Sequence, residues 1–377
     1  YRIHLWDGKK PKRALGSAAV LHATAPTIAH MWHMPGHIYD KLKRYPESAW
    51  HQEASARVDH RTQAENRVIP DTIHNYAHNN EWLVRNWSHV GRISDSVTMA
   101  KGLIDNPMHP RLNHLGKRNS SSSYGRRRLF EVLERFERWD EIVKLSESHY
   151  LAPTKDTKQQ RERLLRLGRA HFELGSKESL SGLIAELSES EERIKAERTK
   201  KQDAAREKAE KENKDEKETD KLVKEAGKSE DGQLKEIGTI KDELEASLAL
   251  LDGERLDGDR AKKIKREKSG LARMHLRFGD AEEAGKIAAE AVEAGKNRVV
   301  PLAVQAHILE STGDPDGARS AFEALREISS ELEIEEAPFA RLAPLAARLE
   351  MPADWRKDKD WRGEDFGENK PETLQHL

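Results

Sequence analysis

The amino-acid sequence predicts an all-α protein, an α-solenoid of antiparallel helical hairpins from which one charged helical hairpin projects. Two observations carry this prediction. Apolar residues recur at steps of three and four residues along most of the chain, which is the spacing of one helical face. A short corner pattern also recurs six times: an apolar residue, a turn residue, a charged residue, and then the start of a new helix.

The first corner is LKRYPESA, between His37 and His60, where Pro46 suits the first turn of a helix because its missing N–H is not needed there. The other corners are Val90–Val97, Phe136–Val143, Leu174–Leu180, Phe278–Ala284 and Thr312–Ala318. These corners resemble those of tetratricopeptide (TPR) repeats. The last two are spaced at the standard TPR period, whereas the first three are farther apart, so we expect longer helices or links in the early hairpins.

Composition excludes several classes of function. The chain has 377 residues, a net charge of −1 and no cysteine. The charge balance gives no reason to expect nucleic-acid binding, and no apolar run has the length of a membrane span. The lack of cysteine excludes disulfides, thiolate metal sites and cysteine nucleophiles. Because the sequence begins with Tyr1 rather than methionine, we expect it to be a piece of a longer protein.

We expect four parts along the chain. Residues 1–187 form His-rich helical repeats, and residues 252–350 form further repeats. Residues 188–251 are highly charged and are expected to form a projecting hairpin broken at the stretch GKSEDG, with partial disorder as the alternative. Residues 351–377 are a polar tail whose aromatic residues either dock on the repeats or lead to a further domain.

Histidines are concentrated in the first third of the chain and suggest a metal site. His33 and His37 form one i,i+4 pair, and His74 and His78 form another on a helix expected from Asp71 to Val90. Such a pair projects both rings to one side of a helix, as chelation of one ion requires. Imidazole ligands suit zinc, copper or iron, so these four histidines are our candidate ligands for a divalent transition metal.

Other polar and aromatic residues nearby are candidates for ligand binding, with Glu81 also a candidate base; they are His30, Tyr39, Asn75, Asn79, Glu81, Trp82 and Arg85. A structural alternative is that the histidines and asparagines form a buried polar network that holds irregular repeats together. Pro35 favours this alternative, because it is expected to separate His33 and His37 onto different segments.

The stretch from residue 98 to residue 123 is expected to end a helix and continue as a long link, because it contains prolines and four successive serines. The triplet Arg126–Arg128 follows. It is either an anion-binding site or, as such charge runs usually are, a solvated surface paired with nearby glutamates.

Two motifs, HMPGHIY at residues 33–39 and YAHN at residues 76–79, resemble the HMPxHIY and Y-x-HN signature of a group of bacterial TPR proteins. In planctomycete-type bacteria, members of that group are joined to a C-terminal thioredoxin- or peroxiredoxin-like domain. The resemblance implies such a domain in the full-length chain and is compatible with an exported or periplasmic protein. The match covers roughly residues 1–150 and the tail.

Two functions follow as hypotheses. The first is a scaffold that binds a protein or peptide, or positions an adjacent redox domain. It is favoured by the repeats and by the absence of a nucleophile motif, P-loop or dinucleotide fingerprint, which also argues against catalysis by this chain alone. The second is a domain that binds a metal or a small ligand through the histidines of residues 30–89. Such a domain could also be an enzyme. No catalytic residue is identified.

Overall fold

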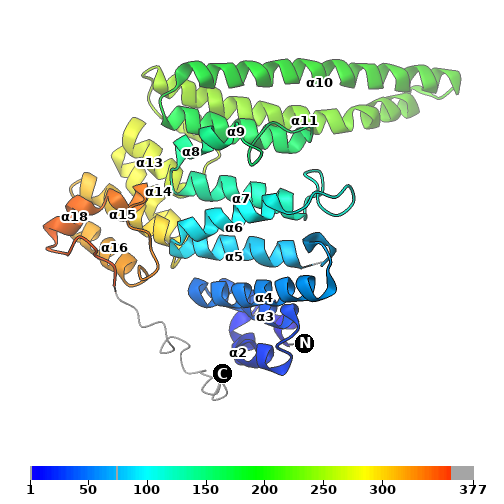
Figure 1. The fold of residues 1–377 in the computed structure, drawn as a ribbon. Helices are drawn as coiled ribbons and strands as arrows, with labels where there is room; N and C mark the ends of the chain where they lie inside the picture. The colour runs from blue at the N-terminus through cyan, green and yellow to red at the C-terminus, as the bar shows by residue number, and fades with distance from the viewer. Residues whose placement is uncertain (1, 74, 358–377) are drawn as a thin grey trace. The chain divides into compact units, whose positions relative to one another are not determined.

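The computed structural model describes residues 2–73 and 75–357, and these residues form helices and connecting turns with no β-strand (Figure 1). The all-α prediction is therefore confirmed. The helices group into two compact units, each of which is described by itself. One unit combines the described residues of the ranges 1–138 and 268–377, and the other consists of residues 139–267.

The first unit begins with short helices and continues with paired long ones. Its N-terminal elements are α1 (Arg2–Trp6), the 3-10 helix η1 (Pro11–Ala14), α2 (Leu15–Thr24), α3 (Ala29–Lys41), α4 (Tyr45–Asn66), the 3-10 helix η2 (Pro70–Thr72), α5 (Tyr76–Val90), α6 (Ile93–Asp105) and α7 (Ser121–Arg135). Each long helix packs against the one before it, from α2 to α7. The helical-repeat architecture predicted from the sequence is thus present in these helices.

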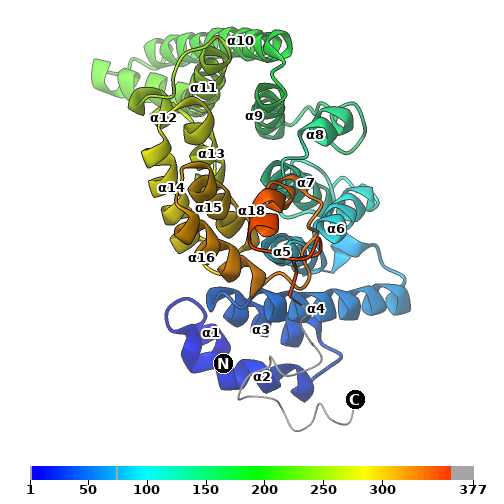
Figure 2. The ribbon, with the colours of Figure 1, turned by 90° about the vertical axis from the view of Figure 1, so that its left-hand side faces the viewer.

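The remaining helices of this unit come from the C-terminal part of the chain; they are α13 (Lys268–Phe278), α14 (Ala281–Ala294), α15 (Val299–Ser311), α16 (Pro315–Arg326), α17 (Ala337–Ala340) and α18 (Ala343–Arg348). Helix α15 contacts α5, so segments far apart in the sequence meet (Figure 2). At this junction the hydroxyl and backbone N–H of Ser94 donate to the carboxylate of Glu333, and Glu137 pairs with Arg273 and Arg341.

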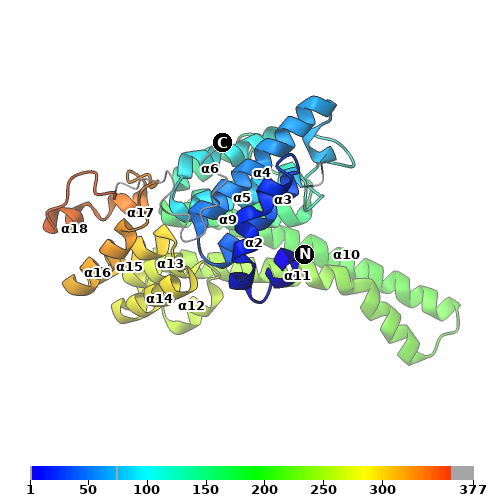
Figure 3. The ribbon, with the colours of Figure 1, turned by 90° about the horizontal axis from the view of Figure 1, so that it is seen from below.

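The second unit contains α8 (Trp139–Leu145), α9 (Thr157–Glu173), α10 (Lys177–Lys211), α11 (Glu216–Leu251) and α12 (Gly258–Lys263). Helices α10 and α11 form the expected charged hairpin and run side by side (Figure 3). The hairpin turns between Lys211 and Glu216, so the predicted break at residues 227–232 is wrong. There α11 continues, because Gly227 has no side chain and lets Gln202 of α10 pack closely against it.

All six predicted corners lie between consecutive helices, and they share a backbone feature. At five corners the residue just before the new helix's N-cap has positive φ; these residues are Lys43, Gly91, Glu137, Gly175 and Gly313. A left-handed residue ends one helix and reverses the chain. At Gly91, glycine is needed for a second reason, because an added Cβ would lie 2.9 Å from the side chain of Leu332.

Two local predictions are corrected. Helix α5 begins at Tyr76 rather than at Asp71, because Pro70–Thr72 forms a separate 3-10 turn and the Asp71 carboxylate accepts from the backbone N–H of Ser121. The run of serines does not belong to a link. Ser120 caps α7 and the next three serines are its first turn, where capping side chains satisfy free N–H groups.

No helix in the described part of the chain has both the length and the apolar character needed to span a bilayer.

Candidate metal centre

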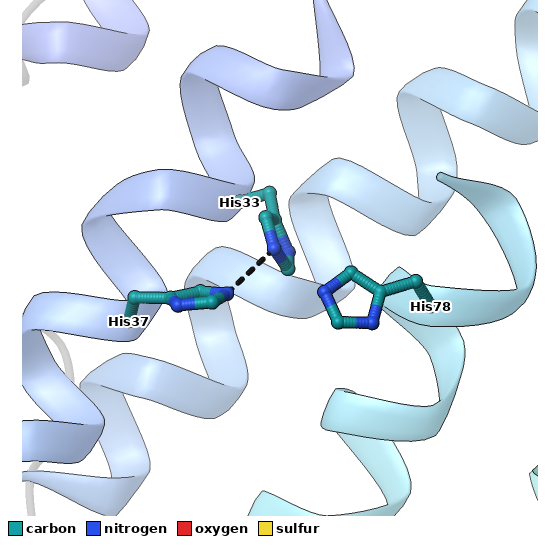
Figure 4. Close-up of side chains that lie close together, drawn as sticks. All are labelled: His33, His37 and His78. Carbon is teal, nitrogen blue, oxygen red and sulfur yellow. Dashed lines mark hydrogen bonds between the residues drawn. The ribbon is translucent and has the colours of Figure 1, made fainter. Parts of the chain in front are cut away.

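Three histidines converge between α3 and α5 (Figure 4). His33 and His37 come from successive turns of α3, and His78 comes from the first turn of α5. One ring nitrogen from each lies within 4.8 Å of the other two, and the Nε2 atoms of His33 and His37 are 2.7 Å apart and hydrogen-bond to each other. The close-up shows a ring nitrogen of His78 facing the other two rings.

Pro35 does not separate His33 from His37, contrary to the prediction, because α3 continues through the proline. Three side chains of α4 hold α3 in place by donating to its carbonyl oxygens: Ser48 to Gly36, Gln52 to His33, and Ser55 to Ala29. These donors are spaced by four and three residues, so they form one polar stripe on α4. The stripe is buried, and it satisfies backbone groups of a helix that contains a proline.

Each imidazole has a polar partner on its Nδ1 side. The Nδ1 of His33 is 2.6 Å from Oε1 of Gln52, the Nδ1 of His37 is 3.6 Å from a carboxylate oxygen of Asp7, and the Nδ1 of His78 is 3.6 Å from one of Glu81. Metal-binding histidines commonly present one nitrogen to the metal while the other interacts with a carboxylate or carbonyl oxygen, which fixes the ring. The arrangement here follows that pattern for all three rings.

Burial favours the neutral form of the two α3 histidines. It lowers the pKa of His33 well below its ordinary value, and the neighbouring His37 and His78 lower it further. Burial also lowers the pKa of His37, against the opposing effect of Asp7. A neutral imidazole has a lone pair to offer a metal, so a cation does not have to displace a proton from these two rings at neutral pH.

Glu81 lies beside His78 and is held by two arginines of α7. Burial would raise its pKa, but the hydrogen bond from His78 and the charge of Arg128 outweigh that effect and leave the pKa lowered. Arg128 hydrogen-bonds to both Glu81 and Glu131. A carboxylate held in this way is ionised at neutral pH and is a weak base, and its contact with Nδ1 of His78 can fix the orientation of that ring.

The three nitrogens are suited to a tetrahedral metal with one open position. Zinc–nitrogen bonds of about 2.0–2.1 Å place the ligand nitrogens roughly 3.3 Å apart in a tetrahedron. The separations in the structure, 2.7 Å for one pair and up to 4.8 Å overall, bracket that value. Three protein ligands leave the fourth position for water or another ligand, as in catalytic rather than structural zinc sites.

Aromatic side chains surround the cluster. The ring of Trp82 stacks on His37, with centroids 4.2 Å apart, and the ring of Tyr124 lies 6.4 Å from His78. The guanidinium of Arg85 lies over Trp82, and that of Arg127 lies over Tyr124. Rings on α5 and α7 therefore border the cluster, and a guanidinium lies against each of them.

The other predicted site residues have different places. Tyr39 is buried in an apolar cluster and stacks on His51. Asn79 is buried and donates to Asp59 of α4. His30 lies one turn before His33 on α3, and the centroids of these two rings are 6.1 Å apart. Asn75 directly precedes α5. The fourth predicted metal ligand, His74, lies outside the described residues.

Sequence reasoning missed three neighbours of the site: Asp7, Gln52 and Tyr124. Gln52 had a usable signal, because Ser48, Gln52 and Ser55 form a polar stripe at helical spacing. The expectation that Arg126–Arg128 pairs with nearby glutamates is confirmed for Arg127 and Arg128, whereas the expectation that the triplet is solvated is wrong for Arg126. Arg126 is buried, and Arg128 bonds to Glu81.

A scan of the sequence against descriptions of known protein families found no matching family, and a search of curated proteins found no relative.

Proposed function

We propose that this protein is a helical-repeat protein that binds one divalent transition metal, with zinc as the first choice, through His33, His37 and His78. The observation that carries the proposal is the convergence of three ring nitrogens within 4.8 Å, with a polar partner on the Nδ1 side of each ring. Structural histidines usually satisfy a single hydrogen bond. Here three ring nitrogens converge on one point, where His33 and His37 hydrogen-bond to each other, and a cation would replace that hydrogen bond with bonds to all three rings.

Metal analysis of the purified protein tests the proposal. Protein made without a histidine tag and loaded with zinc should retain close to one equivalent after removal of free metal, and His78→Ala should retain almost none. His60→Ala is the matched control, because His60 is an exposed histidine of α4. Retention of zinc by His78→Ala, or equal losses in both variants, would contradict the proposal.

Binding of a protein partner is a second candidate, because one cavity in the same unit favours it. The cavity has a volume of about 690 Å³, and its lining includes Trp32, Trp50 and Ala49 together with charged residues such as Glu53 and Arg57. Large aromatic side chains that line a concave surface are typical anchors for a partner. A purified thioredoxin-like domain is the partner to test first, because the sequence motifs imply one. Equal binding to the intact protein and to Trp50→Ala would argue against this surface.

A further inference from the structure

One face of α4 borders the cavity of about 690 Å³, which we call the α4 cavity. The face includes Glu47, Trp50, Glu53 and Arg57, which follow one another at steps of three and four residues. At 1.5 Å per residue, the stretch from Glu47 to Arg57 gives the cavity a length of about 15 Å along the helix. The volume lies within the range of about 300–1,000 Å³ that is typical of small-molecule sites. The α4 cavity is therefore large enough for a small organic ligand.

Two tryptophans form an aromatic corner in the α4 cavity. The ring centroids of Trp32 and Trp50 are 5.6 Å apart, and the ring planes meet at 64°. The indole N–H of Trp32 donates to the carbonyl oxygen of Pro26, and His22 packs against the same ring, so the orientation of Trp32 is fixed. Ala54 also lines the cavity and places only a methyl group one turn from Trp50. Indole rings attract both apolar groups and cations.

The charge of the lining distinguishes between these two kinds of group. Among the described residues, two guanidiniums, those of Arg57 and Arg92, line the cavity with five carboxylates; the carboxylates belong to Glu47, Glu53, Asp95, Glu331 and Glu333. Arg44 pairs with Glu47 from outside the lining, and even with Arg44 included the carboxylates outnumber the guanidiniums. A cleft that carries an excess of one charge attracts ligands of the opposite charge. The lining therefore favours a cation over an anion.

The carboxylates nearest the aromatic corner can accept a further hydrogen bond. Glu47 and Glu53 lie one turn before and one turn after Trp50 on the same face of α4. Glu53 pairs with Arg57, whose side chain is 77% exposed, and exposed pairs of this kind contribute little to stability. Each ionised carboxylate has about four lone-pair sites, so one arginine does not saturate it. An ammonium group beside Trp50 would thus have a carboxylate on either side along the helix.

We propose that the α4 cavity binds a small organic cation, in which an ammonium group is attached to an apolar or aromatic body. The body packs against Trp32 and Trp50, and the ammonium donates to Glu53, with Glu47 on the other side of Trp50. The remaining carboxylates of the lining add to the attraction at longer range. No histidine of the candidate metal centre lines this cavity, so the inference does not rest on the proposed metal binding. It gives the cavity a small ligand in place of a protein partner.

Isothermal titration calorimetry on the full chain at pH 7.5 tests the inference with three probes of similar shape. Phenethylamine is a cation, 2-phenylethanol is neutral, and 3-phenylpropionate is an anion. The variants are Glu53→Gln and Arg57→Gln, which remove opposite charges from one ion pair. Glu65→Gln is the matched control, because Glu65 is an exposed glutamate of α4 that also pairs with an arginine but does not line the cavity.

The expected result is saturable binding of phenethylamine, with 2-phenylethanol about tenfold weaker and 3-phenylpropionate weaker still. Glu53→Gln should weaken phenethylamine binding by about fivefold or more, because it removes the charge-assisted contact. Arg57→Gln should strengthen it by about twofold or more, because it removes a competing cation. Glu65→Gln should bind as the unmodified protein does. A general loss of folding would weaken binding in both lining variants, so the opposite signs identify an electrostatic contact.

Three results would overturn the inference. The first is no binding of phenethylamine, or equal binding of all three probes. The second is a change in the same direction in Glu53→Gln and Arg57→Gln, or a loss in Glu65→Gln as large as that in Glu53→Gln. The third is capture of a thioredoxin-like domain through Trp50 without any binding of the amine, which would assign the cavity to a protein partner. Retention or loss of zinc has no bearing on these outcomes, so the two proposals fail separately.

Discussion

At the scale of single residues, Gly36 determines how closely α4 can approach the face of α3 that carries His33 and His37. A Cβ added at Gly36 would lie 2.4 Å from the Nε2 of Gln52. Gln52 is fully buried, and it is the side chain that contacts Nδ1 of His33. The absence of a side chain at position 36 therefore allows the contact that orients one of the three imidazoles.

We predict that Gly36→Ala lowers metal affinity by about tenfold or more, because Gln52 has to move and partners of ligating histidines typically contribute 10–100-fold to affinity. Overall stability should change little, since the gain in helix propensity of about 1 kcal/mol offsets part of the lost hydrogen bonding. Competition with a chromophoric chelator measures the affinity.

Gly102→Ala in α6 is the control for this variant. No atom lies within 4 Å of a Cβ added at Gly102, so the same substitution should leave metal affinity unchanged. If the two alanine variants bind zinc equally, the orienting role of Gln52 is wrong.

The sequence was informative about some of these residues and silent about others. The i,i+4 spacing of His33 and His37 is a local property of one helix, so it could be read directly. The meeting of that pair with His78, and the contacts of Asp7 and Gln52, depend on how helices pack. Asp7 lies at the end of a short N-terminal helix, and no periodicity marks it as a neighbour of His37.

At the scale of elements, the long hairpin of α10 and α11 has a buried base and a solvated outer part. Leu187, Ile237 and Leu244 are fully buried in the base. Leu244 packs directly against Gly168 of α9, where an added Cβ would lie 2.5 Å from it. In the outer segment 202–229, all of which the structure describes, Ala209 and Gly227 are the buried residues.

We predict that removing residues 202–229, with a short Gly-Ser turn joining Lys201 to Glu230, changes the free energy of unfolding by only about 1 kcal/mol, because little apolar surface is lost. By contrast, Leu244→Ala should cost roughly 2–5 kcal/mol through the cavity it leaves. Urea denaturation followed by circular dichroism measures both. A large loss on shortening would show that the outer segment stabilises the fold.

Sequence patterns predicted helix ends well where chain reversal requires a particular backbone conformation, as at Gly91 and Gly313. They failed at residues 227–232, where two glycines indicated a break. Glycine costs a helix only about 1 kcal/mol, and the close packing of Gln202 against Gly227 lets the helix continue. Tertiary contact therefore overrode a local signal.

At the scale of the whole molecule, several histidines are buried in the neutral form. Burial lowers the pKa of His51 to about 3, and the nearby His22 adds to this effect. Burial also lowers the pKa of His89 well below its ordinary value, with Arg135 and Arg298 contributing. In an unfolded chain these rings would titrate near 6.5.

We predict that the metal-free protein loses stability as the pH falls below about 6.5. Between that value and the lowered folded-state pKa, the unfolded chain binds protons that the folded chain does not, so the free energy of unfolding decreases with acidification. Each such histidine contributes up to about 1.4 kcal/mol per pH unit. Urea denaturation in the presence of a chelator, from pH 7.5 to pH 4.5, measures the slope.

His51→Gln isolates one contribution to this slope. The free energy of unfolding of this variant should depend less steeply on pH, by about the slope that one bound proton contributes. This holds even if the substitution changes the stability at pH 7.5. An unchanged slope would mean that His51 is not kept neutral by the fold.

Anomalous X-ray diffraction from crystals of the zinc-loaded protein tests the central claim most directly, because it locates the metal among its ligands. We predict one zinc peak between α3 and α5, with one nitrogen of each of His33, His37 and His78 at about 2.0–2.1 Å and a fourth ligand from outside these three residues. A zinc peak elsewhere, or full loading with no peak at these histidines, would contradict the account.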